Sequence, residues 1–133
     1  MEQKILEPDI EKRLLKAQRN EITQHFVYER LAKSAREPHN KSVLQRIADE
    51  ELKHHDICNI FTCQDIKPNR MKVWLYYLTS RVFGLTFSLK FMERAEGREH
   101  VIFSELSDTI PETVDIARDE IRHEKELLEL IDD

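Results

Sequence analysis

Helix-breaking residues are scarce in this chain, and their scarcity constrains the fold more than any other feature of the sequence. Only two glycines and four prolines occur among the 133 residues. Because these two residue types most often end helices and form turns, a chain so poor in them is expected to be nearly all helix. Two glycines also cannot build a phosphate-binding loop or a dinucleotide fingerprint, which excludes those nucleotide-binding folds.

The prolines and polar clusters divide the chain into four expected helices. Their predicted ranges are 8–36, 40–64, 69–106 and 111–131. The short connections favour an antiparallel four-helix bundle, formed by one all-α domain over residues 1–133. At 1.5 Å per residue the third helix would be about 57 Å long, against about 42 Å for the first. Either Gly84 or the stretch near Met71 breaks this long third helix, or its first turns pack on another subunit.

Two of the expected helices carry a Glu-x-x-His sequence on the face that should be buried. Glu51 and His54 lie on one face of the second helix, and Glu120 and His123 lie on one face of the fourth. Two such pairs are weak evidence alone, because charged pairs usually lie on solvated faces. The apolar neighbours on the same faces are Leu44, Ile47, Cys58 and Phe61 in the second helix and Ile116, Leu127 and Leu130 in the fourth.

Carboxylates in the other two helices decide the interpretation. Glu21 lies on an inward stripe of the first helix, and Glu93 and Glu96 lie near the inward stripe of the third. Isolated buried carboxylates would each cost several kcal/mol or become protonated. Four carboxylates balance two divalent cations, and oxygen and imidazole ligands suit iron or manganese. The sequence therefore predicts a dinuclear metal site with the ligands Glu21, Glu51, His54, Glu93, Glu96, Glu120 and His123.

At these residues the sequence resembles the rubrerythrin branch of the ferritin-like diiron-carboxylate family. The resemblance covers nearly the whole chain and rests on Glu21 with Tyr28 and on residues 48–54, 92–96 and 117–123. It implies a ferritin-like bundle with two iron ions and with Tyr28 as a hydrogen-bonding neighbour of the site. It also implies that one of Glu93 and Glu96 bridges the irons, while the other exchanges with a histidine. The C-x-x-C pairs of a rubredoxin domain are absent, and no aromatic residue clearly follows the third-helix glutamates.

A closer resemblance concerns the ferritin-like domain found fused ahead of vacuolar-iron-transporter-type membrane domains. It rests on residues 84–93 and on the ending 124–133. Together the resemblances imply an oxidoreductase that oxidises Fe(II) with dioxygen or peroxide and uses an unknown electron donor. The alternative that they imply is a domain that captures or senses Fe(II) for a membrane iron transporter. A metal-free helical interaction protein is the third interpretation.

Charge and cysteine placement restrict the surroundings of the protein. The net charge of −5, without a basic stripe, argues against nucleic acid as a partner. Cys58 and Cys63 are five positions apart in one helix and do not face each other, so free thiols and a cytoplasmic location are expected. The N-terminal residues lack the apolar core of a signal peptide. A membrane tether is expected only within a transporter fusion.

An apolar stretch over residues 73–92 has the length of a membrane span. Arg81 and Lys90 lie inside it and would be costly in lipid, so we expect this stretch in a core or in a homodimer contact. The remaining histidines near the predicted site, His25, His55 and His100, are lesser candidates that we expect to be structural or exposed.

Overall fold

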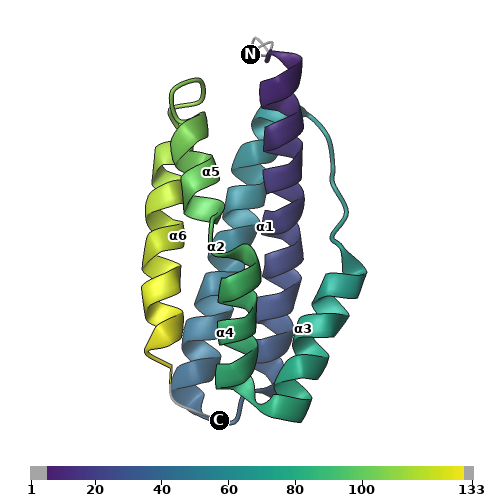
Figure 1. The fold of residues 1–133 in the computed structure, drawn as a ribbon, viewed down its shortest axis with the longest axis vertical. Coiled ribbons are helices and arrows are strands. Elements are labelled where there is room, and N and C mark those ends of the chain that lie inside the picture. Colours follow the sequence, from purple (N-terminus) through teal and green to yellow (C-terminus); the bar gives the residue numbers. More distant parts are fainter. Residues whose placement is uncertain (1–5, 131–133) are drawn as a thin grey trace.

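Six α-helices make up most of the chain over residues 6–130, the part that the computed structural model describes (Figure 1). No strand occurs within these residues, so the all-α prediction is confirmed. The helix end expected near Ile131 and the first residues of the chain lie outside the described range. The helices are α1 (Pro8–Ser34), α2 (Pro38–Thr62), α3 (Arg70–Phe83), α4 (Leu85–Glu96), α5 (Glu99–Leu106) and α6 (Thr113–Leu128).

Local sequence explains most of the helix boundaries. Both α1 and α2 begin with a proline in the first turn, where the missing N–H has no helical partner to lose. The side chain of Asn69 caps α3 by accepting a hydrogen bond from the backbone N–H of Lys72 at 3.2 Å. At the start of α6 the Thr113 hydroxyl lies 2.9 Å from the carbonyl oxygen of Phe103 and 2.8 Å from that of Ile110, and it can donate to either.

The predicted long third helix is wrong, because two glycines divide it into α3, α4 and α5. Gly84 has a φ of 94°, which side-chain-bearing residues rarely adopt, and α3 and α4 pack against each other on either side of it. The alternative that placed a break at Gly84 is therefore confirmed. The second break was not predicted. A Cβ at Gly97 would lie 2.4 Å from the carbonyl oxygen of Glu93, so only glycine fits there.

The helices run roughly along the long axis of the molecule (Figure 1). α1 packs mainly along α2, α5 packs on α6, and α3 lies against α1 and α4. α5 follows α4 along this axis, as Figure 1 shows. Within residues 6–130, no helix is both long enough and apolar enough to pass through a bilayer.

A layer of buried polar residues divides the core into two apolar clusters. One cluster contains Val27 and Leu31 of α1, and the other contains Leu14 of the same helix. Glu21 lies between them and is fully buried. α2 repeats this order, with Leu44, Ile47 and Ala48 in the first cluster, Glu51 and His54 in the polar layer, and Cys58 in the second cluster. The polar layer is therefore the candidate functional site of the fold.

Candidate metal centre

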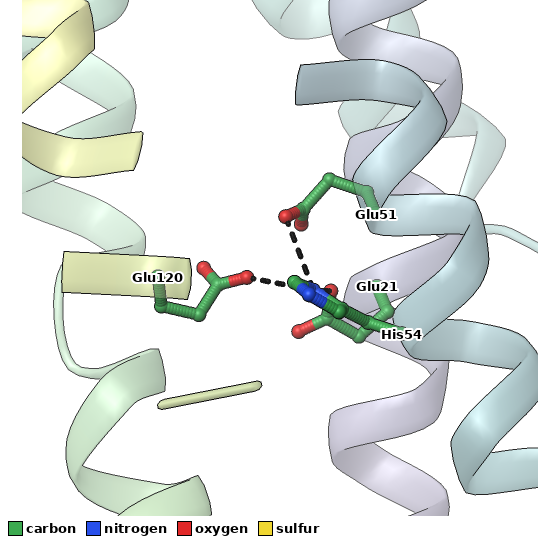
Figure 2. Close-up of side chains that lie close together, drawn as sticks. All are labelled: Glu21, Glu51, His54 and Glu120. Carbon is green, nitrogen blue, oxygen red and sulfur yellow. Dashed lines mark hydrogen bonds and ion pairs between the residues drawn. The ribbon is translucent and has the colours of Figure 1, made fainter. Parts of the chain in front are cut away.

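Four side chains from three helices converge in the polar layer. Glu21 comes from α1, Glu51 and His54 come from α2, and Glu120 comes from α6, as Figure 2 shows. Each offers a potential ligand atom, and these atoms all lie within 4.8 Å of one another. The Glu21 and Glu51 side chains are fully buried. This group could hold a metal ion.

His54 stands at the middle of the group. Its Nδ1 lies 3.3 Å from Oε2 of Glu21, 3.5 Å from Oε1 of Glu51 and 3.3 Å from Oε1 of Glu120. In Figure 2 Glu120 reaches from its own helix towards the ring, while the two other carboxylates approach from the side of α1 and α2. One ring nitrogen therefore faces three carboxylates.

His123 of α6 extends the cluster beyond these four residues. Its ring lies 5.9 Å from that of His54, centroid to centroid, and the two rings are stacked. Its Nδ1 lies 2.9 Å from Oε1 of Glu51 and 3.9 Å from Oε1 of Glu120. Glu51 and Glu120 thus each present the same oxygen to the Nδ1 atoms of both histidines. Each of these two carboxylates therefore contacts both histidines of the centre.

The outer nitrogen of each histidine contacts an acidic residue of the opposite motif. Nε2 of His54 lies 2.8 Å from Oδ2 of Asp119, and Nε2 of His123 lies 2.5 Å from Oε2 of Glu50. An ionised carboxylate only accepts hydrogen bonds, so each contact places the proton of a neutral imidazole on Nε2. Nδ1 then presents a lone pair to the cluster. This orientation is the one that metal-binding histidines commonly receive from a carboxylate partner.

Neither of these acidic partners was identified from the sequence. A signal was present, because an acidic residue directly precedes the glutamate of both Glu-x-x-His motifs: Glu50 precedes Glu51, and Asp119 precedes Glu120. Adjacent residues in a helix point in different directions, so which histidine each acid would reach depends on how α2 and α6 pack.

Burial and mutual repulsion shift the pKa values of the cluster. Burial, together with the neighbouring carboxylates, raises the pKa of Glu21 and of Glu120. Burial alone would also raise the pKa of Glu51, but its contacts with His123 and His54 outweigh burial and lower it. Burial lowers the pKa of His54, yet the surrounding carboxylates prevail and raise it. The metal-free centre therefore retains protons that a cation would displace.

Several polar atoms of the centre lack any hydrogen-bond partner in the described chain. Leaving a buried polar atom unsatisfied costs about 1–3 kcal/mol, and more when the group is charged. A cation bound at this point would compensate these atoms, and the donor set fits one. The atoms without a hydrogen bond are Oε1 of Glu21, both carboxylate oxygens of Glu51, Oε1 of Glu120 and Nδ1 of His123, although Nδ1 of His123 and Oε1 of Glu51 lie within ion-pair distance of each other.

The two predicted ligands of the third helix, Glu93 and Glu96, lie outside this group. Oε1 of Glu96 accepts hydrogen bonds from Nζ of Lys72 at 2.8 Å and from the hydroxyl of Tyr76 at 3.1 Å, which direct it towards α3. Glu93 lines a cavity beside the centre, where burial and a contact with Glu124 raise its pKa to about 7. The structure does not bring either carboxylate into the four-residue cluster.

Glu99 is a buried carboxylate that the sequence did not single out. Its side chain is 6% exposed; Oε1 accepts a hydrogen bond from Asn20 at 2.7 Å, and Oε2 has no partner. Burial raises its pKa to about 7, the Asn20 contact opposes the rise, and the nearby Glu96 and Glu51 carboxylates add to it. After the break at Gly97, Glu99 begins α5, and the new helix direction places this carboxylate in the interior.

The cavity beside the centre connects these outer carboxylates with the cluster. Glu93, Glu99, Glu120 and His123 all line it, as does Tyr28. Tyr28 is 6% exposed, and burial together with the surrounding carboxylates raises its pKa, which keeps the phenol protonated as a hydrogen-bond donor. A small oxidant or a cation could reach the polar layer through this space.

The lesser histidine candidates have other contacts. Nδ1 of His25 lies 2.7 Å from the carbonyl oxygen of Ala48, and Nε2 of His55 lies 3.3 Å from Nε2 of Gln18. His100 lines the cavity and contacts Glu124 at 3.9 Å. None of the three belongs to the four-residue cluster.

The donor atoms of the centre are carboxylate oxygens and imidazole nitrogens, a set that iron and manganese accept readily. The nearest thiol, that of Cys58, is buried in the apolar cluster below His54, and burial raises its pKa. It therefore packs as an apolar side chain rather than serving as a thiolate ligand. Comparison of the chain with protein-family models, curated proteins and solved structures gives no match in any of the three.

Proposed function

We propose that this chain is a ferritin-like diiron-carboxylate protein of the rubrerythrin kind that oxidises Fe(II) with dioxygen or peroxide. One observation carries the proposal: Glu51 and Glu120 each present one oxygen to the Nδ1 atoms of two stacked histidines. Two carboxylates shared between two imidazoles are what a pair of metal ions requires, because each ion can take one histidine and both can share the carboxylates.

The remaining ligands follow from the positions of the other carboxylates. Glu21 contacts only the His54 half of the pair, and Glu99 has an unpartnered oxygen on the side of the cavity. With Glu51 and Glu120 they make four negative charges, which two divalent ions neutralise. Iron is the proposed metal and manganese the alternative, since both favour oxygen and imidazole ligands. When bound, two Fe(II) ions would supply two electrons to the oxidant.

The chain's own residues prepare this chemistry. Glu50 and Asp119 hold the imidazole protons on Nε2 and leave Nδ1 free for a ligand bond. The apolar clusters above and below the polar layer exclude water from both ends. Tyr28 supplies a protonated phenol in the cavity lining through which an oxidant would approach.

Stopped-flow oxidation tests the proposal. The protein is first loaded with Fe(II) under anaerobic conditions. It is then mixed with dioxygen or peroxide, and the appearance of ferric absorption is followed. We expect fast oxidation of about two Fe(II) per chain, and a loss of at least about a hundredfold in rate for Glu51→Gln, since that variant lacks a shared ligand. Asp115→Asn, an exposed acid on α6, should react like the unaltered chain. Equal rates for all three proteins would contradict the proposal.

The second candidate function is capture or sensing of Fe(II) for an iron transporter. The cavity favours it, because Glu93, Glu124 and His100 line the space beside the cluster and could pass a cation inward. The same stopped-flow experiment, run with Fe(II) in excess over the two ions that each chain would hold, separates the two functions. Repeated turnover with stoichiometric consumption of oxidant supports the oxidoreductase, whereas one slow oxidation with iron retained in the protein supports capture or sensing.

A further inference from the structure

The outward side of α3 and α4 has an unusual composition. Over residues 70–98 every exposed charged residue is basic, and every other exposed residue is apolar. We call this surface the α3–α4 face. Its cations are Arg70, Arg81, Lys90, Arg94 and Arg98, and its apolar members are Met71, Trp74, Leu75, Leu78, Val82, Phe83, Phe87, Phe91 and Ala95.

Helical spacing and ring contacts make these residues one surface. The apolar positions of α3 recur at intervals of three and four, which places them on one side of the helix. Phe87 and Phe91 do the same on α4. Across the turn between the helices, the rings of Phe83 and Phe87 lie 4.9 Å apart and join the two stripes. The face therefore continues from one helix to the next.

The positive charge of the face is local. The whole chain carries a net charge of −5, so the residues outside the basic face together carry a net negative charge. The two acids of the segment, Glu93 and Glu96, are half-buried and line the cavity beside the metal centre instead. Arg30 of α1 adds a further exposed cation, because its guanidinium stacks over the rings of Trp74 at 4.8 Å and Tyr77 at 5.5 Å.

The exposed apolar area is larger than a monomer usually leaves in water. Eight large side chains of the face are between 40% and 84% exposed. With about 150–250 Å² for each aromatic side chain, the four aromatic members of the face alone expose roughly 300–500 Å², and the four aliphatic members add to this area. The largest apolar patch of an ordinary soluble monomer is about 300–600 Å². Something is therefore expected to cover the face.

We propose that the α3–α4 face docks on the surface of an anionic lipid bilayer. Amphipathic helices with Trp, Phe and Leu on one side and Lys or Arg beside them lie in the plane of the interface, with the apolar side chains among the acyl chains. Each nearby cation adds electrostatic attraction to an anionic leaflet. A second copy of the chain is the competing occupant, but a two-fold contact would set this basic face against itself with no exposed acid to neutralise it.

The only tryptophan of the chain provides the measurement. Trp74 lies on the face and is half exposed, so its emission should shift to shorter wavelength when it enters the interface. The full chain is mixed with vesicles of phosphatidylcholine alone or with added phosphatidylglycerol. We expect the shift, and flotation with the vesicles, only when phosphatidylglycerol is present. The binding should weaken by at least about tenfold in roughly 0.5 M salt, because salt screens exposed charges.

Matched variants locate the contact. Leu78→Glu should abolish flotation, whereas Ile60→Glu, at an exposed apolar position of α2, should not. Arg81→Glu combined with Arg94→Glu should lower vesicle affinity by at least about tenfold, since two attractive charges are reversed. Lys12→Glu combined with Lys16→Glu, two exposed positions of α1, should leave it unchanged. Helical circular dichroism of each variant shows that it is folded.

Three results would overturn the proposal. The first is the absence of binding to phosphatidylglycerol vesicles, and the second is an equal loss of binding in the face variants and their controls. The third is a dimer in sedimentation equilibrium that Leu78→Glu dissociates and that binds no vesicle, which would assign the face to a second copy of the chain.

Discussion

His54 and His123 each use both ring nitrogens, and this double use defines the candidate centre. The inner nitrogens face carboxylates at the middle of the core, and the outer nitrogens contact Asp119 and Glu50. A histidine held in this way has one tautomer and one orientation in its neutral form. The two acids would therefore position these histidines as ligands without touching a bound metal.

Removing one of these acids should weaken metal binding without abolishing it. Asp119→Ala frees Nε2 of His54, so the imidazole can take either tautomer and rotate. Loss of such a partner typically lowers metal affinity by about 10–100-fold. Competition titration with Mn(II) under anaerobic conditions measures the change. Asp115→Ala, an exposed position of the same helix, is the control, and equal affinity of the two variants would refute the positioning role.

Glu99 should give the metal-free protein an unusual dependence of stability on pH. Its pKa rises from the ordinary value of 4.5 to about 7 on folding, mainly through burial. Between these values the folded chain binds more protons than the unfolded chain, so the free energy of unfolding should fall as the pH rises from about 4.5 to 7. For this one group the fall should be on the order of 1–3 kcal/mol.

Urea unfolding in the presence of a chelator, at a series of pH values, tests this prediction. Glu99→Gln should make the decline shallower, because the amide does not titrate and the contribution of Glu99 is lost while those of the other buried carboxylates remain. Glu105→Gln, an exposed position of the same helix, should retain it. A metal-free protein that gains stability over this pH range, or a decline that Glu99→Gln leaves unchanged, would contradict the account.

At the scale of elements, the sequence predicts the long helices and fails at the short ones. The ends of α1, α2 and α6 lie close to their expected positions. Prolines and polar residues next to these ends signal them, and such signals can be read from the local sequence. The segment over residues 69–106 is harder to predict, because the sequence offers Gly84 and the stretch near Met71 as alternative breaks and offers none at Gly97. The φ of Gly84 and the close approach of Gly97 to Glu93, four residues earlier, are seen only in the folded chain.

The same breaks explain which site residues the sequence could identify. Glu21, Glu51, His54 and Glu120 lie on uninterrupted helices, where helical spacing alone predicts the inward direction. Glu96 lies at the end of α4, just before the break, and Glu99 begins α5, just after it. A continuous helix through this region would place other residues on the inward face, so helical spacing does not identify Glu99.

Gly97→Ala should disturb the fold and the centre together. The added Cβ would lie 2.4 Å from the carbonyl oxygen of Glu93 and 2.6 Å from its Oε1, so the backbone between α4 and α5 must move. We expect a loss of about 1–3 kcal/mol in the free energy of unfolding, as for other overpacked sites. Metal affinity should fall as well, because Glu99 is displaced.

Ala95→Gly is the matched control for this substitution. Ala95 lies in the last turn of α4, two positions before Gly97, at an exposed position, and its substitution should cost about 1 kcal/mol through helix propensity alone. Its metal affinity should stay unchanged. Equal affinities for Gly97→Ala and the unaltered protein, measured by anaerobic titration, would show that the break between α4 and α5 does not position the ligands.

At the scale of the whole molecule, the polar layer should lower the free energy of unfolding of the metal-free protein. A bound cation should raise that free energy again. The polar layer separates two apolar clusters, so neither cluster can compensate for unsatisfied carboxylates between them. A bound cation should stabilise the fold by about 2.7 kcal/mol at a hundredfold excess over its dissociation constant. Stability and metal binding are therefore expected to be linked through this layer.

Glu21→Gln should separate the effect of the polar layer on the stability of the metal-free protein from its effect on stabilisation by metal. The side chain is fully buried and its pKa is raised, so a neutral amide of the same shape should stabilise the metal-free protein at pH values well above the ordinary pKa of a carboxyl group. The variant should also lose most of the stabilisation that metal gives. Thermal unfolding with and without Mn(II) measures both changes. A metal-free variant that is less stable than the unaltered protein would show that Glu21 has a purely structural role.

Anaerobic titration with Fe(II) is the sharpest test of the proposed metal centre, because it counts the ions that the converging carboxylates and histidines would hold. We expect saturable uptake of about two ions per chain, and near-complete loss of uptake in Glu51→Gln and Glu120→Gln. Asp115→Asn should bind like the unaltered chain. Absence of saturable uptake, or equal uptake by all of these variants, would contradict the account.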